Sequence, residues 1–312
     1  MTQNLTTLSG QPAGNFVFGT MQFGGRADTV QSRAMFDACR AAGIRHFDTA
    51  YLYTDGNSET LLGQMIGTAR DDLLIATKVC YRGDASPENM RREFDVCRQR
   101  LGQEMVDVLY LHQFDPDTDL RRTMEGFAAL KDEGAIRYVG LSNFAAWQVM
   151  KAVMAAAELG LSIDILQPMY SLVKRQAEVE ILPMCADQGI TEATYSPLGG
   201  GLLTGKYGAG GAGRLSEDSR YAARYGLDWM HRTGQDLATL AADRGVGAAT
   251  LAVAWVASHP SGPNPIISAR NAEQLAPSLA AMTFDMDAEL RAEISALSLT
   301  LPPATDRIEE TR

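Results

Sequence analysis

Four polar side chains follow apolar, strand-like runs of the sequence, and together they have the chemistry needed to reduce a carbonyl group. Asp48, Lys78 and His112 each stand at the end of such a run, and Tyr53 lies in the segment just after Asp48. In a parallel β/α barrel the carboxyl ends of all strands face one mouth, where catalysis takes place. We therefore expect these four side chains to meet at that mouth.

The reaction requires a proton donor, because hydride addition to a carbonyl leaves an alkoxide that must be protonated. The phenol of Tyr53 is a reluctant donor and a poor base at its ordinary pKa of about 10. An ammonium group such as Lys78 lowers the pKa of a neighbouring phenol, and Asp48 would hold that ammonium charged and in place. A neutral His112 would donate to the carbonyl oxygen and stabilise its developing charge. Taken singly, these residues equally suit a buried ion pair, a core histidine and a rim tyrosine.

Strand-like runs alternate with segments of helical period along the whole chain, which predicts a parallel sheet with crossover helices. The expected strands are residues 16–20, 44–48, 73–78, 106–112, 136–141, 163–167, 190–195 and 265–268. The expected helices are residues 28–42, 58–67, 86–101, 120–133, 145–159, 175–188, 234–244, 248–258, 271–282 and 288–297. Eight strand–helix units favour a single (β/α)8 TIM barrel domain over residues 1–312, with an extra helix at its C-terminal end, over a doubly wound sheet.

One glycine-rich segment, residues 199–229, interrupts this rhythm. It is too long for an ordinary strand–helix connection, so we expect a loop that closes over a ligand at the catalytic mouth. We also expect the tail, residues 303–312, to be mobile. The first strand is not followed by the GxGxxG spacing of a dinucleotide-binding Rossmann unit, so a nicotinamide cofactor would be bound in another way.

Composition narrows the class of partner and the compartment. The 312 residues carry a net charge of −10, which argues against nucleic-acid and anionic-membrane partners, because both present phosphates. The apolar stretches fall short of the roughly 20 residues that a membrane span needs. The four cysteines form no CxxC pair and the N-terminus lacks a signal-peptide layout, so we expect reduced thiols in the cytoplasm.

Seven short stretches, in order along nearly the whole chain, resemble the aldo-keto reductase superfamily. They are Gly19-Thr20-Met21, residues 47–53 (FDTAYLY), Ala76-Thr77-Lys78, Leu111-His112, residues 140–144 (GLSNF), Gln167 and Tyr195-Ser196-Pro197-Leu198. The run 195–207 (YSPLGGGLLTGKY) is most similar to the branch that contains general aldehyde reductases and potassium-channel β subunits. The resemblance implies a (β/α)8 barrel that transfers hydride between NADPH and the carbonyl of a small aldehyde or ketone. Tyr53 would be the general acid.

The resemblance also implies the cofactor contacts. Ser142, Asn143 and Gln167 would bind the nicotinamide carboxamide and Tyr195 would stack on the ring. The remaining contacts would come from Thr20, Met21 and Asp48 at the mouth, from Ser196, Pro197, Leu198, Gly200, Lys206 and Arg214 around the pyrophosphate, and from Ser268, Arg270, Gln274 and Ser278 around the adenosine phosphate.

Arg270 is the candidate contact for a 2′-phosphate, which favours NADPH with NADH as the alternative. Pro277 and Ser278 stand where the family usually has an acidic residue and an asparagine.

Two alternatives to a reductase remain at this stage. An NADPH-binding module that reports redox state to a partner would keep the same four residues. A metal-dependent barrel hydrolase could use His46, Asp48 and His112, since His46 and Asp48 share one face of a strand. The substrate pocket would draw its apolar lining from loops, with Met21, Phe23, Tyr51, Phe114 and Trp229 as candidates. The pattern does not distinguish a monomer from a homo-oligomer.

Overall fold

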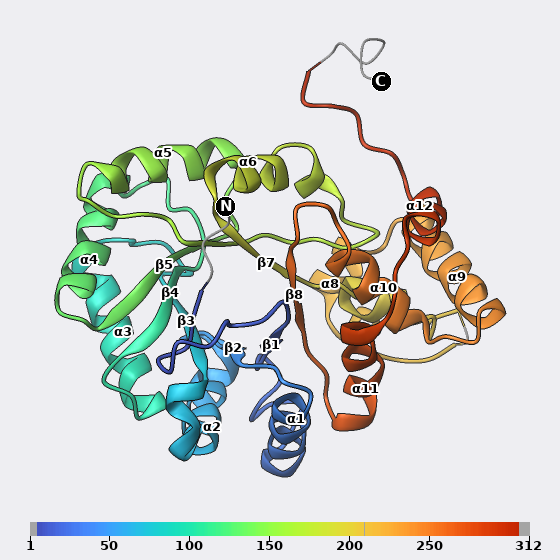
Figure 1. The fold of residues 1–312 in the computed structure, drawn as a ribbon, viewed down its shortest axis with the longest axis horizontal. Coiled ribbons are helices and arrows are strands. Elements are labelled where there is room, and N and C mark those ends of the chain that lie inside the picture. Colours follow the sequence, from blue (N-terminus) through green and yellow to red (C-terminus); the bar gives the residue numbers. More distant parts are fainter. Residues whose placement is uncertain (1–4, 209, 306–312) are drawn as a thin grey trace.

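The computed structural model describes residues 5–208 and 210–305, and within them eight parallel strands form a closed barrel (Figure 1). The strands pair in sequence order, and β1 closes the barrel by pairing with β8. They are β1 (Val17–Gly19), β2 (His46–Asp48), β3 (Leu74–Val79), β4 (Val106–Leu111), β5 (Ile136–Ser142), β6 (Ile165–Gln167), β7 (Thr191–Tyr195) and β8 (Asn264–Ile267). The predicted TIM barrel is confirmed, and every expected strand is present with ends that differ by at most two residues.

The helices surround this barrel, and two of them differ from the expectation. They are α1 (Thr29–Ala41), α2 (Asn57–Ile66), α3 (Pro87–Leu101), α4 (Leu120–Asp132), α5 (Ala146–Ala157), α6 (Ile181–Gln188), α7 (Arg214–Glu217), α8 (Ser219–Arg224), α9 (Asp228–Asp243), α10 (Ala248–Ala257), α11 (Ala272–Ala280) and α12 (Ala288–Ala296). The expected helix 175–188 is a short 3-10 turn followed by α6, because Pro183 is tolerated only in a first helical turn. Helix α9 begins before Gly234, which packs against Leu202.

The glycine-rich segment 199–229 is more ordered than a loop. It contains a 3-10 turn, η4 (Gly199–Thr204), then α7 and α8, and its last residues open α9. The extra C-terminal helix is α12. Of the tail 303–312, residues 306–312 lie outside the described residues.

Side chains alternate between the barrel interior and the helical layer, and this alternation decides where polar residues point. Leu74 and Ala76 of β3 lie in the cluster that fills the barrel, as do Val108 and Tyr110 of β4. Because strand side chains have a period of two, Lys78 continues the inward row of β3. His112 continues the inward-facing row of β4, and Asp48 lies on the same face of β2 as His46. These polar residues therefore lie above the apolar interior, at the carboxyl ends of the strands.

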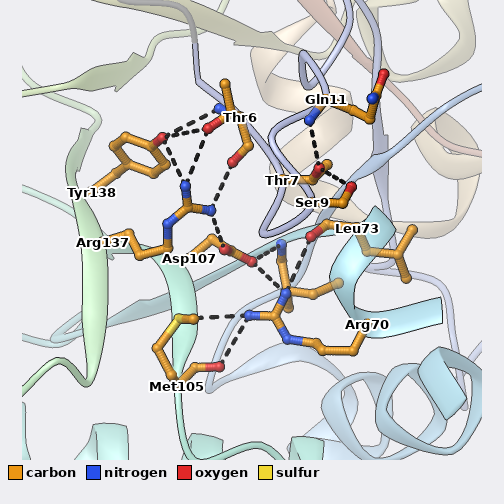
Figure 2. A network of polar contacts seen from close by, with 11 residues as sticks. Thr6, Thr7, Ser9, Gln11, Arg70, Leu73, Met105, Asp107, Arg137 and Tyr138 are labelled. Atoms are coloured by element: carbon orange, nitrogen blue, oxygen red, sulfur yellow. Dashed lines mark hydrogen bonds and ion pairs between the residues drawn. The ribbon is translucent and has the colours of Figure 1, made fainter. Parts of the chain in front are cut away.

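The opposite end of the barrel is closed by residues of the N-terminal segment and by a buried carboxylate (Figure 2). Asp107 accepts from the Arg70 guanidinium at 2.8 Å, from the Arg137 guanidinium at 2.8 Å and from the Ile75 amide at 2.9 Å. Arg137 also donates to the Thr6 carbonyl oxygen at 2.7 Å. These contacts attach the N-terminal segment to the amino ends of the strands.

The four cysteines are free thiols and buried. Among the described residues, no single helix has the length and hydropathy of a membrane span, and only the sharply bent pair α9 and α10 passes that test when joined.

Candidate active site

The structure brings Asp48, Tyr53, Lys78 and His112 together at the carboxyl ends of β2, β3 and β4. The Lys78 ammonium donates to Asp48 Oδ1 at 2.5 Å and to the carbonyl oxygen of Thr49 at 2.7 Å. It also lies 3.4 Å from the hydroxyl of Tyr53. Lys78 and Asp48 are buried, so their ion pair is shielded from solvent. The arrangement is a phenol held against a buried ion pair.

Tyr53 is positioned by a strained turn after β2. Thr54 and Asp55 both have left-handed backbone conformations, with φ of 48° and 54°. The hydroxyl of Thr54 donates to the Phe23 carbonyl oxygen at 2.8 Å and accepts from the Ser58 amide at 3.0 Å. These bonds hold a conformation that costs about 1–3 kcal/mol for a non-glycine residue, and such strain concentrates at functional sites.

His112 lies between two tyrosine rings. Its ring centroid is 6.0 Å from that of Tyr53, nearly perpendicular to it, and 4.8 Å from that of Tyr81. Burial and the nearby Lys78 charge hold the pKa of His112 well below its usual range, so the imidazole is neutral. Its Nδ1 atom is buried and has no hydrogen-bond partner in residues 5–208 or 210–305. A neutral imidazole suits the expected role as a donor to a carbonyl oxygen.

We expected Tyr53 to have a lowered pKa beside Lys78, and the net direction is the opposite. Burial raises the pKa of Tyr53 well above its ordinary value, and the Asp48 carboxylate raises it further. Burial likewise lowers the pKa of Lys78 and raises that of Asp48, while their mutual attraction opposes both changes. The carboxylate lies so close to the ammonium that the phenol faces a neutralised pair. Tyr53 therefore keeps its proton at neutral pH and is a donor, not a base.

A chain of hydrogen bonds links four expected nicotinamide contacts to Asp48. The Tyr195 hydroxyl donates to Asn143 Oδ1 at 2.6 Å, and the Asn143 amide lies 3.2 Å from the Ser142 hydroxyl. Ser142 donates to the Gln167 carbonyl oxygen at 3.1 Å, and the Gln167 amide donates to Asp48 Oδ2 at 3.0 Å. Asn143 adopts a left-handed φ of 58° at the end of β5. The four residues share one wall of the mouth.

The residues after β1 lie beside this wall but differ in their exposure. Thr20 is buried and donates to the Asp48 carbonyl oxygen at 3.0 Å, so its hydroxyl supports the backbone of the site. Met21 is half-buried. Phe23 is fully buried and packs on Phe18 at 5.6 Å between ring centroids, so of lining and core it belongs to the core. The other lining candidates, Tyr51, Phe114 and Trp229, are half-buried.

Cations from three distant segments gather around Glu217 of α7. The Glu217 carboxylate accepts from Arg270 at 2.8 Å and pairs with Arg26 at 3.1 Å. Burial and the positive charges of Arg270 and Arg214 lower the pKa of Lys206, which places these cations in one region. A single carboxylate leaves this group with an excess of positive charge, as a site for phosphate groups requires.

The loop after β7 has a backbone shaped for a bound dinucleotide phosphate, and two buried hydroxyls, one after β8 and one in α11, have no protein partner among the described residues. Ser196 and Gly200 have left-handed φ of 61° and 66°, and a Cβ atom on Gly200 would lie 2.9 Å from the Tyr221 ring. The Ser268 and Ser278 hydroxyls are buried without a hydrogen-bond partner among the described residues. Unsatisfied buried hydroxyls are rare, and a ligand is one common explanation.

The other expected phosphate contacts have simpler placements. Pro197 is buried and Leu198 half-buried directly after β7. Gln274 donates its backbone amide to Asn271, the N-cap residue of α11, at 2.8 Å. The residues present therefore fit a nicotinamide dinucleotide.

Sequence reasoning missed several residues that support the site. Glu59 of α2 is buried, accepts from the Thr77 hydroxyl at 2.6 Å and pairs with Arg100 at 3.1 Å. Tyr81 packs on His112, and Glu217 joins the cations described above. Glu59 stands at an inward position of a helix, where a charge is unusual, but no local pattern links it to its partners.

The three residues of the hydrolase alternative do not form a metal site. Among the described residues, no group of three or more His, Cys, Asp or Glu side chains is arranged to hold a metal ion. His46 lies below Asp48 in the barrel, and its Nε2 atom has no hydrogen-bond partner among the described residues. Burial lowers the pKa of His46 to about 3.

Comparison with known proteins places these residues in a family context. The protein-family model described as Aldo/keto reductase family matches residues 15–298 of this sequence. The chain is 31% identical over 322 residues to a probable voltage-gated potassium channel subunit beta of Arabidopsis thaliana, covering 97% of this chain and 94% of that protein. It is 32% identical over 295 residues to the uncharacterized oxidoreductase YrpG of Bacillus subtilis (strain 168), covering 87% and 88%. It is 36% identical over 197 residues to aflatoxin B1 aldehyde reductase member 2 of Rattus norvegicus, covering 61% and 54%.

Proposed function

Because the chain belongs to the aldo/keto reductase family, we propose that it reduces the carbonyl group of small aldehydes or ketones with NADPH and that Tyr53 donates the proton. The observation that carries this proposal is the Tyr53 hydroxyl, 3.4 Å from an ammonium group that is itself paired with Asp48. The similarity to an aldehyde reductase supports a carbonyl substrate. We also propose a cytoplasmic location, on the sequence grounds given above.

In the reaction, the residues of this chain orient the substrate and donate a proton to it. NADPH supplies the hydride when it is bound. His112, being neutral, donates to the substrate oxygen and directs it toward Tyr53. The phenol is protonated at neutral pH and donates as negative charge develops on that oxygen. Lys78, 3.4 Å from the hydroxyl, then stabilises the phenolate that forms and offsets part of the cost of burying that charge.

The cations around Glu217 support the proposal of NADPH over NADH as the cofactor. Arg270 has a planar fork of donors that suits a phosphate monoester, and within residues 5–208 and 210–305 its partner is the half-exposed Glu217 carboxylate. A 2′-phosphate would compete with Glu217 for Arg270. Segment 199–229, which carries Glu217, would then close over the bound cofactor as a clamp.

The test is to replace Tyr53 with Phe and to measure NADPH oxidation with generic aldehydes. Turnover should fall by about 10²–10⁴-fold, the usual contribution of a general acid, while NADPH affinity and the fold are unchanged. The matched control is Tyr81→Phe, which removes a hydroxyl from the ring on the other side of His112 and should leave most of the turnover. A Tyr53→Phe variant that retains more than about a tenth of the wild-type rate would assign the proton to another group.

A second candidate function is an NADPH-binding module that reports redox state to a partner. The similarity to proteins named as probable potassium channel β subunits favours it, since the chain covers nearly all of their length. The two candidate functions differ in the rate at which the protein should reduce generic aldehydes. Wild-type protein that binds NADPH tightly but turns over no generic aldehyde would support the module.

A further inference from the structure

A cavity lies at the end of the barrel away from Asp48, Tyr53, Lys78 and His112. It has a volume of about 370 Å³ and is lined by Ser9, Gln11, Arg40, Gly43, Arg45 and Asp72. Arg45 directly precedes β2 and Asp72 precedes β3, so the cavity faces the amino ends of strands whose carboxyl ends carry Asp48 and Lys78. It is therefore separate from the site described above, and its volume is in the range of small-molecule sites.

Two half-buried arginines line this cavity without a partner. The guanidinium groups of Arg40 and Arg45 form no hydrogen bond or ion pair with residues 5–208 or 210–305. Arg70 and Arg137, equally half-buried at the same end of the barrel, both bind the Asp107 carboxylate (Figure 2). A guanidinium that is partly removed from water and unpaired is a strong site for an anion, and arginine matches phosphate oxygens with two parallel hydrogen bonds.

The backbone holds these arginines on one side of a tight turn. Arg40 lies in the last turn of α1, and Gly43 reverses the chain with a left-handed φ of 88°. The Gly43 amide donates to the Arg40 carbonyl oxygen at 3.0 Å, and the Ile44 amide donates to the Cys39 carbonyl oxygen at 2.9 Å. The turn brings the chain back toward Arg40, and the side chains of Arg40 and Arg45 line the same cavity.

The polar residues opposite the arginines are also fixed. Residues of the N-terminal hairpin bond to one another through Thr7, whose amide donates to the Gln11 carbonyl oxygen at 2.8 Å. The Ser9 amide donates to the Asp71 carbonyl oxygen at 2.8 Å, and the Ser9 hydroxyl donates to Asp72 Oδ1 at 3.0 Å. Asp72 therefore presents a carboxylate, which can only accept hydrogen bonds, in the same cavity as the two arginines.

We infer that this cavity binds a small phosphomonoester that carries a free hydroxyl group. The phosphate would bind Arg40 and Arg45, and the hydroxyl would donate a hydrogen bond to Asp72. Gln11, whose side-chain amide makes no hydrogen bond within the described part of the chain, adds a neutral donor. Phosphates of nucleic acids or of a membrane surface are disfavoured, because the whole chain has a net charge of −10.

The test is isothermal titration calorimetry with glycerol 3-phosphate on protein saturated with NADPH, which blocks the cations around Glu217. Saturable binding with one site is expected. Arg40→Gln and Arg45→Gln should each weaken it by about tenfold or more, as for the loss of a charged hydrogen bond. The matched control is Arg33→Gln on the same helix, where Arg33 pairs with Asp37 at 3.6 Å, and it should bind like wild type.

A second arm tests the hydroxyl. Inorganic phosphate should bind more weakly than glycerol 3-phosphate, and Asp72→Ala, which removes the acceptor, should remove that preference while a thermal melt shows the fold retained. Absence of saturable binding, binding that survives both arginine substitutions, or equal affinity for the two probes in wild type would each overturn the inference. None of these readouts needs carbonyl turnover, so a failure of the proposed reductase activity and a failure of this inference can be told apart.

Discussion

Replacing Lys78 with Met should destabilise the protein by about 3–5 kcal/mol, the usual cost of removing one partner of a buried ion pair. The ammonium donates to Asp48 Oδ1 at 2.5 Å and to the Thr49 carbonyl oxygen at 2.7 Å. Asp48 and Thr49 are buried, so water does not reach these oxygens to replace the ammonium. Without Lys78, the side-chain partner left to the Asp48 carboxylate among the described residues is Gln167, at 3.0 Å. Methionine fills most of the volume, so the cost comes from the charge and not from a cavity.

The pH dependence of this loss has a definite sign. Burial already raises the pKa of Asp48, and the attraction of Lys78 opposes that rise. In the Lys78→Met variant the pKa of Asp48 therefore rises further above the ordinary value of about 3.9 that it has in the unfolded chain. The folded variant then binds this proton more tightly than the unfolded chain does, so its stability falls as pH rises. The difference from wild type should be larger at about pH 8 than at about pH 5.

Equilibrium urea unfolding at these two pH values measures the effect. The double variant Asp48→Asn, Lys78→Met is the control, because it buries no unpaired charge and should be more stable than Lys78→Met alone. A Lys78→Met variant within about 1 kcal/mol of wild type at both pH values would refute the buried ion pair, as would a difference that does not change with pH.

Three further predictions concern the cofactor site and the helical layer. Arg270→Ala should weaken NADPH binding by roughly tenfold to a hundredfold and leave NADH binding nearly unchanged in fluorescence titrations, and equal losses would exclude a contact to the 2′-phosphate. Limited proteolysis between residues 208 and 213 should be rapid in the free protein and suppressed by saturating NADPH, whereas identical digestion would contradict closure of the 199–229 clamp. Burial raises the pKa of Glu192 to about 8, so the folded protein keeps this proton and loses stability as pH rises from the ordinary glutamate pKa toward 8. Urea unfolding of Glu192→Gln should lack this part of the pH dependence, and matching pH profiles for the two proteins would contradict it.

The barrel and the strands that carry the four candidate site residues were predictable from the sequence, because both follow from local periodicity. Strand runs alternate with helical segments, and side chains on a strand alternate with a period of two, so Asp48, Lys78 and His112 had to lie near one mouth. The errors at the level of elements, such as the late start expected for α9, arose where tertiary packing stabilises a glycine inside a helix. Local propensity alone places a helix boundary at such a residue.

Burial and contacts between distant segments were decided by the tertiary structure. The sequence indicated that Lys78 would lower the pKa of Tyr53, but the direction depends on how far the phenol is removed from water and on how closely Asp48 neutralises the ammonium. The bridge from Glu217 to Arg26 and Arg270 joins three segments with no local signal for one another. The strength of a charge's effect depends on distance and on exclusion of solvent, and neither quantity exists until the chain has folded.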